Sequence, residues 1–335
     1  MKVSIIIPVY NVAPYIADCL RSVMWQTYTG TMECLIVDDC GTVDSIAIAE
    51  RMIADYKGPV RFQILHHEQN RGLSAARNTG TEAAIGEYLY YMDSDDEITE
   101  DCIERLMGKV AEYPDVEMVQ GNACRHLMGG GSVNLVKDVL VSSVKSNEEV
   151  RRCFYQFGQI YVNVWNKLLR RDFVVNNSIL CKEGLLYEDN LWGFYLLRYL
   201  EKAAFVSEVT YHQKKRPNSI TTGTDFKTEG LSWCVIYREI LNDLTPGYEQ
   251  EEFDYYRKRI CNDFLRFARN VPEFEKVFRL CKEKCKIYGS RSLQLRLAIC
   301  SVLGPLKYGR KIWKLMAWLI HPVKKIKTKL NAARK

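Results

Sequence analysis

Proline is scarce in this sequence, with 9 residues among 335. Long disordered segments are usually rich in proline and poor in apolar residues, whereas 47% of this chain is hydrophobic. The pattern G-x-G-x-x-G, which marks the dinucleotide site of many oxidoreductases, does not occur. The composition therefore predicts a chain that folds throughout, and it disfavours a dinucleotide-dependent oxidoreductase.

A hydrophobic signal region with a cleavage site is also lacking at the start, which reads MKVSIIIPVYN. The 12 cysteines are scattered over a long chain, unlike the dense frameworks of small secreted domains. We therefore expect reduced thiols and a cytoplasmic protein. The closest cysteines with ligand-like spacing, Cys281 and Cys285, have no histidine nearby, which disfavours a structural zinc site there.

Acidic residues are absent from residues 284–335, which contain 14 Lys or Arg. The first 283 residues hold the other 33 basic side chains and all 41 acidic ones, so the formal net charge of +6 conceals a net charge of −8 there. Because the basic excess is confined to the tail, nucleic acid is not expected as a partner.

The first third of the sequence alternates β-branched runs with amphipathic patterns, which is typical of βαβ units. Strands are predicted at residues 3–9, 33–37, 61–66, 88–92 and 116–121, and helices at 13–26, 44–56 and 73–84. From about residue 147, and throughout beyond 227, the pattern is helical. We therefore predict an α/β fold with a mostly parallel Rossmann-like sheet, flanking helices and a helical C-terminal region.

Polar side chains follow three of the predicted strands. They are Tyr10 and Asn11, then Asp38 and Asp39, and then Asp93, Asp95 and Asp96. In open α/β sheets, ligands bind outside the carboxyl ends of the strands. Carboxylates gathered at one edge repel one another unless a cation is present. The order Asp93-Ser94-Asp95 after an apolar strand suits Mg²⁺ or Mn²⁺ with a diphosphate, since both ions prefer oxygen ligands.

Four runs in this region together resemble the family 2 glycosyltransferases with the GT-A fold, of the bacterial surface-polysaccharide type. They are VSIIIPVYN (3–11), IVDD (36–39), NRGLSAARN (70–78) and MDSDD (92–96). The resemblance covers about residues 1–220 and continues in VWNKL (164–168), YED (187–189), YH (211–212) and RPNSI (216–220). One departure is DCGTVD at residues 39–44, where the family usually has Asp-Gly-Ser-Thr-Asp, so the shape of this loop stays open.

The resemblance implies that the nucleoside lies against Pro8, Val9 and Tyr10, while Asp39 hydrogen-bonds a base such as uracil. An N-cap for the following helix is the alternative for Asp39. Further donor contacts are implied at the four residues Arg71, Arg77, Asp93 and Ser94, although Arg77 could instead pair with a carboxylate at the edge of the sheet. Asp95 is the strongest metal ligand, with Asp93 beside it.

The acceptor hydroxyl must lose its proton as the new bond forms, and the resemblance assigns this base to Asp189. A carboxylate that only favours the start of a helix is the alternative. Glu188, Trp165 and Trp192 are acceptor candidates, although such tryptophans often belong to the core. His212 is a further candidate for the metal or diphosphate or a structural histidine, and Lys215 or Arg216 could hold phosphates.

The resemblance therefore implies an inverting transfer, by a single displacement, from a nucleotide diphosphate sugar, with UDP as the expected nucleotide. The acceptor is a carbohydrate or a lipid-linked oligosaccharide in surface polysaccharide biosynthesis. One alternative is a sugar nucleotidyltransferase, although residues 9–14 lack its Gly-rich basic loop. The other is an inactive GT-A scaffold at a membrane surface.

The basic tail carries an apolar stripe at three- and four-residue steps, formed by Ile312, Leu315, Met316, Leu319, Val323, Ile326 and Leu330. Lysines lie among these positions, with Trp313 and Trp318, so we expect a reversible anchor on the inner face of the cell membrane. Packing on the body or in a homo-oligomer is the alternative. The predicted division is 1–220 (halves 1–105 for the nucleotide and 106–220 for the acceptor), 221–290 and 291–335.

Overall fold

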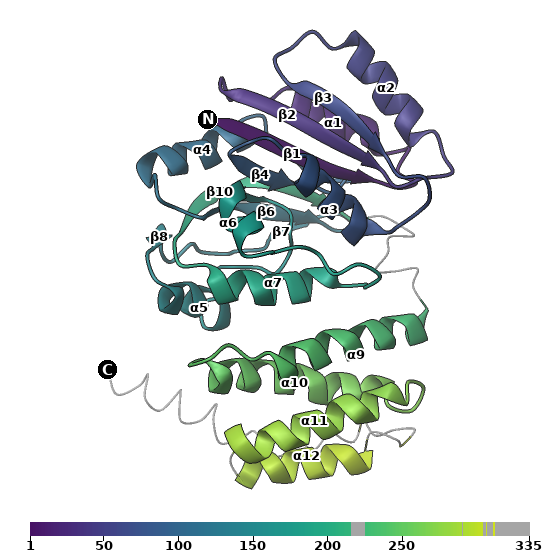
Figure 1. Cartoon of the computed structure of the whole chain (residues 1–335), viewed down its shortest axis with the longest axis vertical. Coiled ribbons are helices and arrows are strands. Elements are labelled where there is room, and N and C mark those ends of the chain that lie inside the picture. The colour runs from purple at the N-terminus through teal and green to yellow at the C-terminus, as the bar shows by residue number, and fades with distance from the viewer. Residues whose placement is uncertain (216–224, 290, 304–305, 307–310, 312–335) are drawn as a thin grey trace. The chain divides into compact units, whose positions relative to one another are not determined.

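The computed structural model describes residues 1–215, 225–289, 291–303, 306 and 311 (Figure 1). It divides the chain into two compact units, Met1–Thr222 and Gly223–Lys335. Most of the predicted tail helix lies outside the described residues, from Ile312 onward, and so does Arg216.

The first unit is built on a mixed sheet. Its order is β3 (Arg61–His66), β2 (Thr31–Asp38), β1 (Lys2–Val9), β4 (Tyr88–Tyr91), β9 (Lys167–Arg170), β6 (Met118–His126), β10 (Ala203–Lys214) and β5 (Glu97–Ile98). Two short strands lie off this path: β7 (Ser132–Asn134) pairs with β6, and β8 (Ser143–Val144) pairs with β10.

The strands β3, β2, β1 and β4 are parallel, which confirms the predicted βαβ half. Strand β1 is buried from Val3 to Val9, because helices cover both faces of a parallel sheet. Beyond β4 the sheet is no longer purely parallel, since β9 is antiparallel to both β4 and β6. The sequence pattern does not predict β9 and β10, because periodicity alone does not separate short apolar runs from pieces of helix.

Seven helices accompany this sheet in the described part of the first unit. They are α1 (Ile16–Met24), α2 (Ser45–Asp55), α3 (Leu73–Ala83), α4 (Cys102–Glu112), α5 (Asn147–Tyr155), α6 (Arg171–Asn176) and α7 (Glu188–Tyr199). The odd-numbered residues of β1 share one core with α1 and α4. Helix α3 packs on the other face, where a Cβ at Gly80 would lie 2.4 Å from Cγ2 of Ile6. This close approach sets the position of α3 against β1.

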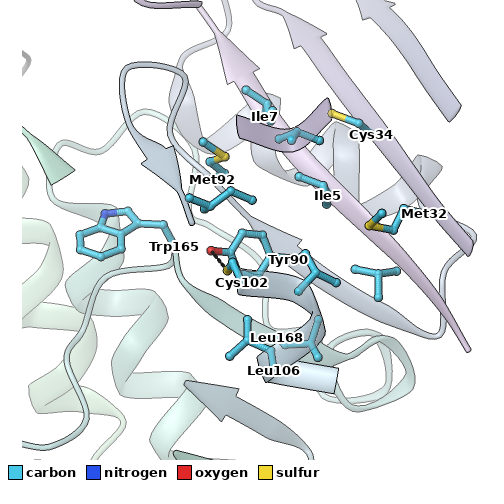
Figure 2. Close-up of a cluster of buried hydrophobic side chains, with 14 of the residues drawn as sticks. Ile5, Ile7, Met32, Cys34, Tyr90, Met92, Cys102, Leu106, Trp165 and Leu168 are labelled. Atoms are coloured by element: carbon cyan, nitrogen blue, oxygen red, sulfur yellow. Dashed lines mark hydrogen bonds between the residues drawn. The ribbon is translucent and has the colours of Figure 1, made fainter. Parts of the chain in front are cut away.

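Polar side chains are built into the core between β4, β6 and β10. Figure 2 shows Tyr90 and Cys102 in this core, with the thiol of Cys102 donating to the Tyr90 hydroxyl at 3.3 Å. Asn166 is fully buried, and its Oδ1 accepts from Tyr90 Oη at 3.0 Å and from Thr210 Oγ1 at 2.9 Å. The backbone of Asn166 is left-handed, with φ 56°. Asparagine tolerates this conformation better than most residues, so Asn166 both turns the chain and links β4 to β10.

The second unit is helical in its described residues, as predicted. It contains α9 (Phe226–Asn242), α10 (Glu249–Phe267), α11 (Glu273–Tyr288) and α12 (Arg291–Leu303). Aromatic rings dominate its core, where Phe264 and Phe278 stack with their centroids 4.0 Å apart. Among the described residues, no helix combines the length and the apolar character that crossing a bilayer requires.

Candidate active site

The carboxyl ends of β1, β2 and β4 meet at one edge of the sheet. Strand β1 lies between the other two, with Val9 opposite Asp38 in β2 and Ile6 opposite Tyr91 in β4. The structure therefore brings the predicted polar strand ends together: residues 10–11 after β1, Asp39 after β2, and the loop at residues 93–96 after β4.

The nucleoside candidates at the end of β1 differ in exposure. Pro8 and Val9 are buried in the strand, whereas Tyr10 is 46% exposed. The next residue, Asn11, has φ 53°, and its Oδ1 accepts from the backbone N–H of Thr42 at 2.7 Å. This bond ties the end of β1 to the loop of residues 39–44, whose sequence departs from the family pattern. Tyr10 is thus the accessible member of the predicted pocket.

Asp39 holds the loop that leads into α3. Its Oδ1 accepts from the backbone N–H of Arg71 at 2.8 Å and contacts His67 Nδ1 at 2.7 Å, and its Oδ2 accepts from the N–H of Gly72 at 2.8 Å. The alternative of an N-cap for the following helix is wrong, since Asp44 occupies the N-cap of α2. The side chain of Asp39 is 3% exposed, and both of its carboxylate oxygens already accept from the loop. Its contact with a nucleobase stays a prediction, and a base would have to share these oxygens with the loop.

Arg77 connects two acidic segments that lie far apart in the sequence. The side chain is buried, its Nη2 lies 2.7 Å from Oδ1 of Asp93, and its Nη1 pairs with Oε1 of Glu188. Burial alone would lower the pKa of this guanidinium, but the carboxylates of Asp93 and Glu188 outweigh burial and raise it. Arg77 therefore stays charged and joins the loop after β4 to the start of α7. This agrees with the alternative in which Arg77 pairs with a carboxylate at the edge of the sheet.

The loop after β4 is anchored through its last aspartate. Tyr211 Oη in β10 donates to Oδ2 of Asp96 at 2.7 Å and accepts from the N–H of Asp93 at 3.2 Å. The backbone N–H of Lys214 donates to Oδ1 of Asp96 at 2.8 Å. Burial and the neighbouring carboxylates of Asp95 and Asp93 raise the pKa of Asp96. Asp96 is thus committed to structure.

Asp93 and Asp95 remain as the cation candidates of this loop. The side chain of Asp93 is 27% exposed and that of Asp95 is also partly exposed, whereas Ser94 between them is buried. Both accessible side chains offer carboxylate oxygens, which suit Mg²⁺ or Mn²⁺. The residues present therefore fit a divalent cation with a diphosphate.

Asp189 stands in the first turn of α7, two residues after a strained residue. Tyr187 precedes the helix with φ 61°, an uncommon conformation for a bulky side chain that is found at functional sites. Asn190 Nδ2 donates to Oδ1 of Asp189 at 2.7 Å, and Asn163 Nδ2 lies 3.4 Å from Oδ2. Burial raises the pKa of Asp189, while the charge of Arg77 opposes the rise. Such a shift moves a carboxylate toward the range useful to a general base.

A buried lysine, which the sequence did not single out, lies near Asp189. Lys167 is fully buried, its Nζ donates to the backbone carbonyl of Asn163 and lies 4.0 Å from the centroid of the Tyr161 ring. Burial lowers the pKa of this ammonium well below its usual range, and the charge of Asp189 opposes the shift. The VWNKL run contains this residue, but burial of a lysine cannot be seen in a short motif.

Three predicted acceptor residues lie inside the protein. Trp165 and Trp192 are 3% and 2% exposed, and Trp165 stacks on Tyr211 with their centroids 4.4 Å apart. Buried rings offer no face to a sugar, so the predicted stacking does not fit these positions and the core alternative does. Glu188 is also buried, and its pairing with Arg77 replaces the predicted acceptor contact.

Arg71 and His212 lie at the margins of this region. Arg71 is 45% exposed, and its Nη2 lies 3.2 Å from Oε1 of Glu183, so its guanidinium is accessible to a donor. His212 lies in β10 between Tyr211 and Lys214, the two residues of this strand that hold Asp96. Among the described residues, a ligand atom of His212 lies within 4.8 Å of ligand atoms of Cys124 and His126. In that same part of the chain, His212 does not form such a group with Asp93 and Asp95. A role of His212 at the donor cation stays a prediction.

The sequence matches known proteins over this region. Residues 4–169 match the family model described as Glycosyl transferase family 2. The chain is 32% identical to the uncharacterized glycosyltransferase YibD of Escherichia coli (strain K12) over 325 residues. This alignment covers 95% of this chain and 92% of that relative.

Solved structures share the fold. The crystal structure of S. aureus TarS 1-349 in complex with UDP-GlcNAc superposes with a TM-score of 0.73 at 19% identity, over 95% of this chain and 92% of that one. The mannosyltransferase PcManGT from Pyrobaculum calidifontis, in complex with GDP-Man and Mn²⁺, gives a TM-score of 0.55 at 16% identity, over 95% and 84% of the two chains. At these identities, the likeness shows the fold alone.

Proposed function

Because this chain belongs to glycosyl transferase family 2, we propose that it transfers a sugar from a nucleotide diphosphate sugar to a hydroxyl group of a carbohydrate acceptor, with inversion. One observation carries the proposal. Arg77 holds Asp93, in the loop suited to a cation, and Glu188, the neighbour of Asp189, so the donor and base candidates belong to one connected site.

The donor would lie along the edge formed by β1, β2 and β4. Tyr10 offers an exposed ring to the nucleoside, and Arg71 offers an accessible guanidinium to the donor. Asp93 and Asp95 would hold Mg²⁺ or Mn²⁺. When bound, the cation stabilises the charge of the departing diphosphate.

Asp189 would accept the proton of the attacking hydroxyl. A general base has to be unprotonated at working pH yet basic enough to take a proton, and the raised pKa of Asp189 moves it in that direction. The side chains of Asn190 and Asn163 orient its carboxylate. The acceptor would therefore approach from the side of α7.

UDP is the proposed nucleotide, with hexose or N-acetylhexosamine as the sugar. The support is Asp39 beside the nucleoside edge, whose carboxylate could accept from the imide N–H of uracil, and the fold shared with a structure that holds UDP-GlcNAc. The related fold that holds GDP-Man makes guanosine the rival. Competition by free nucleotides tests this choice, and inhibition by GDP much stronger than by UDP would refute it.

A screen of nucleotide sugars for release of free nucleotide diphosphate tests the whole proposal. We expect release with one donor class in Mg²⁺ or Mn²⁺ and none in excess chelator. Asp95→Ala should abolish release and donor binding, because the cation loses a ligand and the remaining carboxylates, without the cation, repel a diphosphate. Full activity in excess chelator would contradict the role of the cation, and no release with any donor would count against transfer.

We also propose that the acceptor is lipid-linked, in surface polysaccharide synthesis, and that residues 291–335 hold the enzyme reversibly on the anionic inner face of the membrane. The sequence supports this through the basic apolar stripe of the tail. Co-sedimentation with anionic and neutral liposomes, with and without residues 290–335, tests the anchor. Equal binding by the truncated chain would refute it and leave docking on the body or a second copy.

A further inference from the structure

A row of possible metal ligands crosses three neighbouring strands, β6, β10 and β5, at the end of the strand order opposite to β3. His212 in β10 is opposite Cys124 in the parallel strand β6 and opposite Glu97 in the antiparallel strand β5. Residues paired in this way point to the same face of a sheet. His126 stands two residues after Cys124, so it also lies on that face.

The side chains of this row converge. One ligand atom from each of Cys124, His126 and His212 lies within 4.8 Å of the other two. His126 Nε2 and His212 Nδ1 are 3.1 Å apart, and the two rings lie with centroids 5.2 Å apart at 40°. Cys124 is buried, His212 is half-buried and His126 is exposed, so the cluster is anchored inside the protein and open to solvent on one side.

This spacing suits a tetrahedral ion. With bonds of about 2.3 Å to sulfur and about 2.0 Å to nitrogen, the ligands of a tetrahedral zinc ion lie roughly 3.3–3.6 Å apart. Small side-chain rotations bring the three atoms to that separation. A thiolate and two imidazoles favour zinc and related transition metals, whereas Mg²⁺ and Mn²⁺ prefer oxygen.

We propose that Cys124, His126 and His212 form a zinc site separate from the acidic donor edge, with Glu97 or a water molecule as the fourth ligand. Glu97 now pairs with Lys214 Nζ, which also lies 3.8 Å from Oδ2 of Asp18. Lys214 therefore keeps an acidic neighbour when Glu97 turns to the ion. The proposal does not depend on the transfer reaction.

Zinc at this position would tie the ends of β6 and β10 together. Residues on either side of His212, namely Tyr211 and Lys214, hold Asp96 and thereby the loop of residues 93–96. The ion would thus stiffen the support of that loop. It would also engage His212, which is then not available to a cation in the donor site.

Metal titration of the untagged full-length chain tests the site directly. Metal-free protein is titrated with Zn²⁺ against a chromophoric chelator and, in parallel, with Co²⁺ while the absorption spectrum is recorded. We expect one equivalent of zinc, unaffected by excess Mg²⁺, and a cobalt spectrum with the tetrahedral ligand-field bands and the thiolate-to-metal band that one cysteine ligand produces.

Two variants and two controls decide the assignment. Cys124→Ser should remove the thiolate-to-metal band, and both Cys124→Ser and His126→Asn should weaken zinc binding by more than the ~10–100-fold that loss of an outer-shell partner causes. Cys40→Ser and His66→Asn are matched controls at exposed positions and should bind as the wild type does. His126 is exposed, so its variant should fold even if Cys124→Ser does not. Absence of stoichiometric zinc, or binding unchanged in His126→Asn, would overturn the proposal.

Discussion

The guanidinium of Arg77 lies 2.7 Å from the carboxylate of Asp93, and this partly buried contact joins α3 to the loop that follows β4. The other Nη atom of Arg77 pairs with Glu188, at the start of α7. One cation therefore neutralises two carboxylates from separate segments. The position of Asp189 relative to the predicted cation ligands depends on this pairing.

Arg77→Met should destabilise the protein strongly, because it leaves the buried carboxylate of Glu188 and the partly buried carboxylate of Asp93 without their cation. We expect a loss of about 3–5 kcal/mol in the free energy of unfolding, measured by denaturant titration at neutral pH. Arg71→Met is the matched control, since Arg71 pairs with Glu183 in solvent and should cost less than about 1 kcal/mol. Equal losses of unfolding free energy in the two variants would show that the pairing of Arg77 with Asp93 and Glu188 stabilises the protein no more than a surface ion pair does.

Asp189→Asn should leave donor affinity nearly unchanged and reduce turnover by on the order of a hundredfold or more, because an amide cannot accept the proton. Titration calorimetry with the donor, beside initial rates, separates the two quantities. Glu188→Gln makes the same chemical change one residue away and should lower stability through Arg77 while keeping a larger share of turnover. If donor binding falls as much as the rate in Asp189→Asn, this residue belongs to the donor site.

Turnover should depend on pH through the raised pKa of Asp189. Burial raises this pKa above its usual value of about 3.9, and only the deprotonated carboxylate acts as a base. Activity should therefore be lost as the pH falls, with a midpoint above that of an ordinary aspartate. The profile of kcat/KM against pH measures the midpoint, and the acidic limb should be absent from the residual activity of Asp189→Asn. A limb that persists unchanged in that variant would assign it to another group.

Lys167→Met should stabilise the protein at neutral pH or leave it unchanged, since it replaces a buried ammonium by an apolar chain of similar length. Burial lowers the pKa of Lys167 in the folded state, so the unfolded chain binds its proton more tightly. The wild type therefore gains stability from this group as the pH rises from the folded pKa toward about 10.4.

Unfolding free energies of the wild type and Lys167→Met, compared at several pH values, measure this effect. The advantage of the variant should shrink as the pH rises through that window, because the proton that stabilises the unfolded wild-type chain is bound less favourably at higher pH. Lys202→Met is the control, since Lys202 pairs with Asp115 at the surface and its pKa is raised rather than lowered. The stability of this variant relative to the wild type should not fall as the pH rises. A variant advantage that stays constant with pH would mean that Lys167 has the same pKa in the folded and unfolded chains, which would contradict the lowered pKa.

The parallel half of the sheet and the place of its polar edge follow from the amino-acid sequence alone. Val3 to Val9 form an apolar run bounded by polar residues, and such runs alternate with helical patterns up to Tyr91. These signals are local, because strand and helix periods act over a few residues. The carboxyl ends of neighbouring parallel strands have to meet, which is why the order of the elements suffices to predict Asp39 and Asp93 at one edge.

Which of these side chains are held inside the protein, and by which partners, depends on the tertiary structure. Arg77 meets Asp93 across 16 positions and Glu188 across 111, Trp165 and Trp192 enter the core, and β9 reverses the direction of the sheet. His212 joins Cys124 and His126 because β6 and β10 pair in one register. Such contacts depend on strand register and on the burial of distant segments, which the packing of the whole unit determines and no short stretch of sequence encodes.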